Sequence, residues 1–227
     1  MDLSYTETQD MLRDTLAKFL ADTYDFETRK KMLASPEGRD PGIWRALSTE
    51  LGLTSAPFAE ELGGMGGGAI ENMIMMEELG KVIAIEPWLQ TVVIGGGALK
   101  AAGGALAEAT IPAIISGDAI IAFAYAEPTG RYNLADLTTT AKADGSGYVL
   151  NGHKASVYAA PWATHLLVTA RTGGSQRERA GVEHPGARQR FAAHHALHLG
   201  AQRPAEPVGQ RHREAHLLAV QDLVRQE

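Results

Sequence analysis

Residues 120–171 read IAFAYAEPTGRYNLADLTTTAKADGSGYVLNGHKASVYAAPWATHLLVTART, and this stretch predicts a group of short strands joined by turns. Apolar, aromatic and β-branched residues fill four runs, at 120–125, 137–144, 148–157 and 165–170. Proline, glycine and asparagine, which favour turns, stand between the runs. Because the runs show no helical periodicity, the stretch favours a small antiparallel sheet structure over βαβ units.

The residues before this stretch predict helices. Ser4 and Glu7 have the spacing of a capping box, and the apolar residues that follow recur at helical spacing to about residue 24. Further helices are expected at 26–34, from Pro41 to a C-terminal cap at Gly52, at 69–81, from Pro87, and at 106–115. We therefore expect an α+β fold. An all-α helical bundle (1–118) is followed by a partial antiparallel β-sandwich domain (119–176) and an irregular tail.

A glycine-rich phrase at 63–68 allows two interpretations. Its G-x-G-x-x-A spacing satisfies the loose form of the dinucleotide-binding fingerprint, and a predicted helix follows. The preceding segment contains Pro57 and two glutamates, so it is not the buried strand that the fingerprint requires. A helix-entry loop is the favoured interpretation. In the following helix, the methionines Met73, Met75 and Met76 could form an adaptable binding surface. The spacing of Met73, Ile74, Met76 and Leu79 instead favours the bundle core.

Composition excludes several classes of function. The 227 residues carry a formal net charge of −6, which argues against nucleic acid as the main partner. No cysteine occurs, so disulfides, thiolate nucleophiles and thiolate metal sites are excluded. The polar, acidic N-terminus is not a secretory signal, and no apolar run is long enough for a membrane span. We expect a cytoplasmic protein with no membrane or nucleic-acid partner.

The composition changes abruptly near residue 177. All seven lysines, seven methionines and six tyrosines lie at or before Tyr158, whereas 177–227 hold eight arginines and six of the eight histidines. Prolines interrupt this segment and no strand alternation is sustained, so we expect a low-complexity, disordered tail. The change of composition suggests that the tail is the product of a shifted reading frame. His194 and His198 have zinc-ligand spacing on a helix, but a third ligand is missing, so no metal site is predicted.

The strand stretch also resembles the flavin-binding middle domain of the acyl-CoA dehydrogenases. The resemblance rests on AEP at 126–128, on DGSGYVLNGHK at 144–154 and on LVTAR at 167–171. The glycine-rich phrase and EELG at 77–80 are similar to the same family's N-terminal domain. In detail, the amino-acid pattern of these motifs is similar to that of the small-subunit type of pimeloyl-CoA dehydrogenase.

The resemblance implies that residues from two places line FAD. These residues are Phe123, Tyr125, Ala126, Glu127, Tyr132, Ser156, Val157 and Tyr158. Three of them depart from the family pattern, since Ala126 replaces a threonine, Tyr132 a serine and Ser156 a tryptophan. The alternative for Phe123, Tyr125 and Val157 is that they pack inside the sheet structure, as strand aromatics usually do.

The resemblance further implies α,β-dehydrogenation of an acyl-CoA thioester, with an electron-transfer flavoprotein or a similar acceptor and a homo- or hetero-oligomeric state. The family's catalytic carboxylate base comes from a C-terminal helical domain, so no catalytic residue is nominated here. We expect a truncated enzyme that is inactive alone. The alternative is a non-catalytic partner subunit that completes another chain's site.

Overall fold

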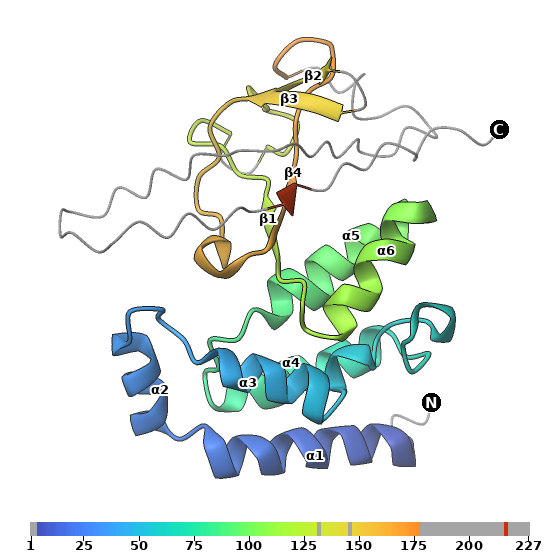
Figure 1. Ribbon diagram of the computed structural model, residues 1–227, viewed down its shortest axis with the longest axis vertical. Helices are drawn as coiled ribbons and strands as arrows, with labels where there is room; N and C mark the ends of the chain where they lie inside the picture. Colours follow the sequence, from blue (N-terminus) through green and yellow to red (C-terminus); the bar gives the residue numbers. More distant parts are fainter. Residues whose placement is uncertain (1–3, 131–132, 145–146, 178–215, 218–227) are drawn as a thin grey trace. The chain divides into compact units, whose positions relative to one another are not determined.

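The computed structural model describes residues 4–130, 133–144, 147–177 and 216–217 (Figure 1). The chain divides into two compact units. The helical unit comprises residues 1–101 and 107–119, and the strand unit comprises residues 102–106 and 120–227. The predicted α+β fold, helical first and stranded afterwards, is confirmed. Among the described residues, no helix combines the length and apolar character needed to cross a membrane.

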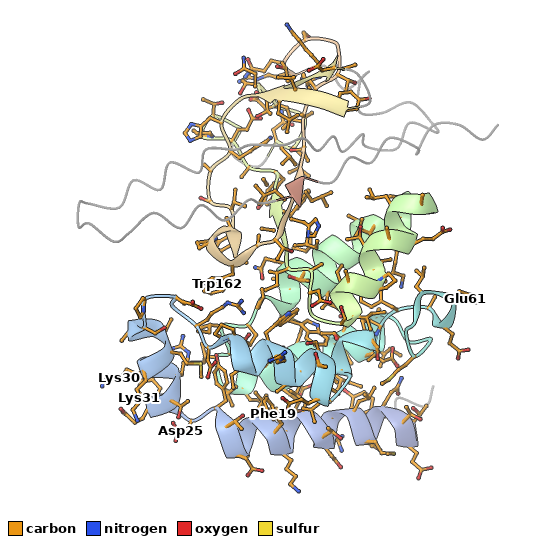
Figure 2. All side chains as sticks on the ribbon, in the orientation of Figure 1. Phe19, Asp25, Lys30, Lys31, Glu61 and Trp162 are labelled. Carbon is orange, nitrogen blue, oxygen red and sulfur yellow. The ribbon has the colours of Figure 1, made fainter. Side chains whose placement is uncertain are left out.

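Most helices begin and end close to the predicted positions. They are α1 (Glu7–Thr23), α2 (Phe26–Ala34), α3 (Pro41–Arg45), η1 (Ala46–Glu50), η2 (Leu53–Ser55), η3 (Glu60–Leu62), α4 (Ala69–Lys81), η4 (Leu89–Gly95), α5 (Gly96–Ala102) and α6 (Gly104–Ile115). Asp25 caps α2, and the exposed Lys30 and Lys31 side chains extend outward from this helix (Figure 2).

The capping box of α1 lies two residues later than predicted. The Thr6 hydroxyl accepts a hydrogen bond from the Gln9 amide, and the Gln9 side chain accepts one from the Thr6 amide, at 3.3 and 3.0 Å. Ser4 and Glu7 satisfy the same spacing rule. A tertiary contact favours the box formed by Thr6 and Gln9, because the Gln9 side chain also donates to the Glu71 carboxylate of α4 at 2.8 Å.

The methionine prediction for α4 is wrong for Met73, which is 50% exposed. Ile74, Met75, Glu78 and Leu79 form the buried face of this helix, and Met76 is half-buried. A helix turns about 100° per residue, so a shift of one or two positions changes which methionine faces the core. The interior of the helical unit is nevertheless apolar, since its almost fully buried side chains include Leu16, Leu47, Phe58, Met75, Trp88 and Ile111.

The described part of the strand unit contains two small sheets. The first has the order β1 (Ile121–Ala124), β4 (His165–Val168) and β5 (His216–Leu217), and the second pairs β2 (Thr140–Asp144) with β3 (Gly147–Asn151). The antiparallel expectation holds for β2 and β3, where Ala141 lies opposite Leu150. It is wrong for β1 and β4, which pair in parallel with Ile121 opposite His165. Because β1 and β4 run in the same direction, the residues between them carry the chain back from the end of β1 to the end at which β1 began.

The strand β5 lies in the segment for which an irregular tail was expected, and it pairs in parallel with β4. Two residues are too few to produce a recognisable alternation in the sequence. The remaining tail predictions, including disorder and the His194–His198 spacing, lie outside the described residues.

Candidate functional site

Two aromatic side chains mark the carboxyl end of β1. Phe123 and Tyr125 are two positions apart, so they point to the same side of the extended chain. Their ring centroids are 5.3 Å apart with an angle of 27° between the planes, which is a stacked arrangement. Phe123 is half-buried, whereas Tyr125 is 39% exposed. The pair therefore presents one accessible aromatic surface supported from behind by a second ring.

The Glu127 carboxylate lies directly after this pair and faces the interior. Its side chain is fully buried. It accepts hydrogen bonds from the amides of Thr138 and Thr139 at 2.6 and 3.0 Å, and also from the Thr138 hydroxyl. The Lys154 ammonium group forms an ion pair with it at 2.8 Å. The segment after β1 is thus fastened to the beginning of the β2 region and to the segment after β3.

The Lys154 ammonium group contacts more than the carboxylate. It lies 3.1 Å from the Thr169 hydroxyl and 3.4 Å from the backbone carbonyl of Tyr125, to which it donates. The Thr169 hydroxyl donates to the same carbonyl at 3.4 Å. One buried cation therefore connects the ends of β1 and β4, and its bond to the Tyr125 carbonyl restrains the backbone that carries the aromatic ring.

Protonation in this cluster follows from its contacts. Burial alone would raise the pKa of Glu127, but the hydrogen bonds from Lys154, Thr138 and Thr139 outweigh burial and lower the pKa to about 2. Burial also lowers the pKa of Lys154, and the Glu127 carboxylate opposes this effect. The carboxylate is therefore ionised at neutral pH, and all of its contacts favour the ionised form. Such a group is a weak proton acceptor.

The backbone brings the second predicted segment against the first. The amide of Ala155 donates to the carbonyl of Ala126 at 2.9 Å. Ser156 follows with a φ of 53°, an uncommon conformation for a residue with a side chain, and is exposed. The Ser156 hydroxyl and the Ala126 amide have no hydrogen-bond partner among the described residues. Two donors without a described protein partner thus lie on adjoining backbone segments.

The other predicted site residues have different environments. Tyr158 is 69% exposed, whereas Val157 packs against the core cluster formed by Ala122, Ala124, Leu166 and Val168. Val157 therefore packs inside the sheet structure, as the alternative for the strand residues expected, and the half-buried Phe123 does so in part. Tyr132 lies outside the described residues.

The sequence argument did not single out four residues that organise this site: Thr138, Thr139, Lys154 and Thr169. Lys154 stands inside the DGSGYVLNGHK phrase, where its charge in a predicted strand region was the available signal. A lysine in such a segment is usually solvated, but this side chain is 5% exposed. Its partners lie 15 to 29 residues away in sequence, so no local pattern identifies them.

Arg171 forms a second buried brace in the strand unit. It is 7% exposed, and its guanidinium group donates to the carbonyls of Leu137, Ala135 and Gln176 at 2.5 to 3.1 Å. Its own amide donates to Thr139 at 2.8 Å, and its carbonyl accepts from Ala141 at 2.7 Å. The residue therefore ties the end of the β4 segment to the residues around the start of β2.

The glycine-rich phrase does not form a phosphate site. Its amides bond within the loop, from Gly64 to Ala59, from Gly66 to Phe58 and from Gly67 to Ala56, at 2.8 to 3.1 Å. A Cβ atom at Gly64 would lie 2.1 Å from the Phe58 carbonyl oxygen. These glycines permit close packing of backbone on backbone, which supports the helix-entry interpretation.

Comparisons with known proteins agree with the two-part architecture. The family model for the acyl-CoA dehydrogenase N-terminal domain matches residues 6–118, and the model for the middle domain matches residues 122–219. The acyl-CoA dehydrogenase FadE29 of Mycobacterium tuberculosis is 29% identical over 188 residues, which are 80% of this chain and 47% of the relative.

Two solved structures illustrate the likeness of the fold. The ChsE4–ChsE5 complex of M. tuberculosis matches with a TM-score of 0.66 and 29% identity, over 75% of this chain and 45% of that chain. A structure described as the electron transferring flavoprotein of Acidaminococcus fermentans matches with a TM-score of 0.69 and 26% identity, over 76% and 46%. The chain thus spans less than half the length of this relative and of these two structures.

Proposed function

Because this chain belongs to the acyl-CoA dehydrogenase family, we propose that it supplies the flavin-facing part of an FAD-dependent acyl-CoA dehydrogenase. The single observation that carries this proposal is the supported aromatic surface at the end of β1, together with the unoccupied donors beside it. Tyr125 offers an accessible ring, and the Ala126 amide and Ser156 hydroxyl have no partner among the described residues. An extended, planar heteroaromatic group with carbonyl and ring-nitrogen acceptors fits such a surface.

FAD in this family accepts a hydride from the β-carbon of an acyl-CoA. In this proposal, Tyr125 and Tyr158 contribute contact area, and the Ala126 amide and Ser156 contribute hydrogen bonds. Phe123 and Val157 support these positions from the interior, and Tyr132 remains a proposed contact. Glu127 acts through Lys154, since its carboxylate is directed at Thr138, Thr139 and Lys154.

The proton-abstracting group is proposed to come from outside this chain's described residues. Glu127 is buried at the site, but its hydrogen bonds and ion pair hold its pKa near 2. A base of that strength would remove an α-proton poorly at neutral pH. We therefore propose that the chain, which spans less than half of its relatives' length, binds flavin weakly and does not turn over acyl-CoA alone.

A second role is favoured by one comparison, since the ChsE4–ChsE5 structure is a complex of two different proteins. In this alternative, the chain is a non-catalytic subunit that completes a partner's site. The proposed redox partner of the assembled enzyme is an electron-transfer flavoprotein or a similar acceptor, as the family resemblance implies.

The test is a titration of the purified chain with FAD, followed by flavin fluorescence and by a dye-reduction assay with acyl-CoA substrates of several chain lengths. We expect weak saturable binding and no dye reduction. Turnover by the chain alone would refute the absence of a base. No binding by the native chain, but binding after addition of a second family member, would favour the partner-subunit role.

A further inference from the structure

Glu86, in the connection between α4 and η4, is the most unusual charged residue of the helical unit. It is 7% exposed, and neither oxygen of its carboxyl group has a hydrogen-bond partner among the described residues. Buried carboxylates are normally paired or hydrogen-bonded, because transfer of a charge from water to a protein interior is unfavourable. Glu86 also lies outside the strand unit and has no role in the proposed flavin site.

Charged and titratable groups from two neighbouring regions act on Glu86. Arg39 and Asp40 lie between α2 and α3, and Asp40 caps α3 by accepting from the Gly42 amide at 2.8 Å. Tyr24, at the end of α1, is 2% exposed and also interacts electrostatically with Glu86. One cation, one anion and one phenol therefore interact electrostatically with a carboxyl group that has no hydrogen-bond partner among the described residues.

The backbone around Glu86 is held by other groups and is strained. Tyr24 accepts a hydrogen bond from the Ile85 amide at 2.9 Å, and Arg29 donates to the Ile83 carbonyl at 2.7 Å. Ile83 has a φ of 52°, which is rare for a β-branched residue, and is 65% exposed. The connection between α4 and η4 is thus fastened at Ile83 and Ile85, and its backbone is strained at Ile83.

We propose that Glu86 is a proton-dependent latch for residues 82–88. With its carboxyl group neutral, the connection stays packed against α1 and the α2–α3 segment. When the group ionises, the strained connection opens and brings the carboxylate to water. Trp88, which is 1% exposed and donates to Asn72 at 3.2 Å, lies at the end of the part that opens.

The direction of the pH dependence follows from burial. Burial raises the pKa of Glu86 to about 7; Asp40 adds to this effect, whereas Arg39 lowers the pKa without outweighing burial. The packed state therefore binds a proton more tightly than the open state does, and opening becomes more favourable as pH rises from about 4.5 to about 7. Residues 1–152 contain no histidine, so the helical unit has no histidine that would titrate in this range.

Hydrogen exchange of the full chain tests the latch. The native chain and Glu86→Gln are compared at the same pH, so that the intrinsic exchange rate cancels. The exchange rate of residues 82–88 in the native chain, divided by the rate in Glu86→Gln, should rise by about two orders of magnitude between pH 5 and pH 8. Glu108→Gln, at an exposed position of α6, is the matched control, and its ratio should not change with pH.

A second variant keeps the test decisive if Glu86→Gln does not fold. Asparagine caps helices as well as aspartate does, so Asp40→Asn should retain the cap of α3 while removing the neighbouring negative charge. The midpoint of the pH-dependent exchange should then move to lower pH. A ratio independent of pH for Glu86→Gln, or an unchanged midpoint in Asp40→Asn, would overturn the proposal.

Discussion

Replacement of Lys154 by methionine should destabilise the strand unit more than any other single lysine replacement. Methionine retains most of the length and apolar stem of lysine but removes the cation. The substitution leaves the Glu127 carboxylate fully buried, with its three hydrogen bonds from Thr138 and Thr139 but without its ion-pair partner. Removing one partner of a buried pair typically costs about 3–5 kcal/mol. The three remaining donors place the expected loss near the lower limit, at about 3 kcal/mol.

Urea unfolding followed by circular dichroism measures this loss, and a double-mutant cycle assigns it to the pair. Glu127→Gln with Lys154→Met removes both charges, so the double variant should be more stable than Lys154→Met alone. Lys142→Met, at an exposed position of β2, is the matched control and should change the free energy of unfolding by less than about 0.5 kcal/mol. The reasoning is refuted if Lys154→Met costs less than about 1 kcal/mol, or if the losses in the two single variants simply add.

Three further measurements address other parts of the chain. The folded-state pKa of Glu127 is about 2, lower than its ordinary value of 4.5. Ionised Glu127 should therefore add about 3 kcal/mol to the free energy of unfolding above pH 4.5, and this contribution should disappear as pH falls towards 2. If the free energy of unfolding of Glu127→Gln had the same pH slope, this reasoning would be contradicted. Tyr125→Ala should weaken FAD binding roughly fivefold in a fluorescence titration, for a lost contact of about 1 kcal/mol, with Tyr148→Ala as the control outside the proposed site. Thr6→Ala should lower the free energy of unfolding by about 1 kcal/mol, and Ser4→Ala should lower it by less. A larger loss in Ser4→Ala than in Thr6→Ala would instead indicate that Ser4 and Glu7 form the capping box.

Sequence patterns predicted the elements that depend on neighbouring residues. The bounds of α2 and α4 match the expected segments, because a cap, a charged first turn and a breaker all lie within a few positions. Patterns were less successful where tertiary contacts choose between local alternatives. Thr6 and Ser4 offer equivalent caps, and the bond from Gln9 to Glu71 favours one of them. The parallel pairing of β1 and β4 depends on the path of the 40 residues between them, on which local periodicity has no bearing.

The same limit applies to the candidate site, where the sequence located the segments but not the contacts inside them. Tyr125 and Ser156 were both predicted to line FAD through a family resemblance, and the hydrogen bond from Ala155 to Ala126 brings the two segments that carry them together. The role of Lys154 became apparent only from its distances to Glu127 and Thr169. Local chemistry gives no direction for a long side chain, so the buried cation could not be distinguished from a solvated one.

Two Glu-Pro dipeptides show why this information is absent from local sequence. Glu86-Pro87 and Glu127-Pro128 both follow an apolar segment, and both glutamates are buried in their own units. Remote residues give Glu127 a cation and three donors, and its pKa is lowered to about 2. No described residue hydrogen-bonds to the Glu86 carboxyl group, and burial raises its pKa to about 7. Their effects on stability therefore have opposite pH dependence. Acid weakens the strand unit through protonation of Glu127, whereas rising pH weakens the helical unit through ionisation of Glu86, so the whole chain should be most stable in mildly acidic solution.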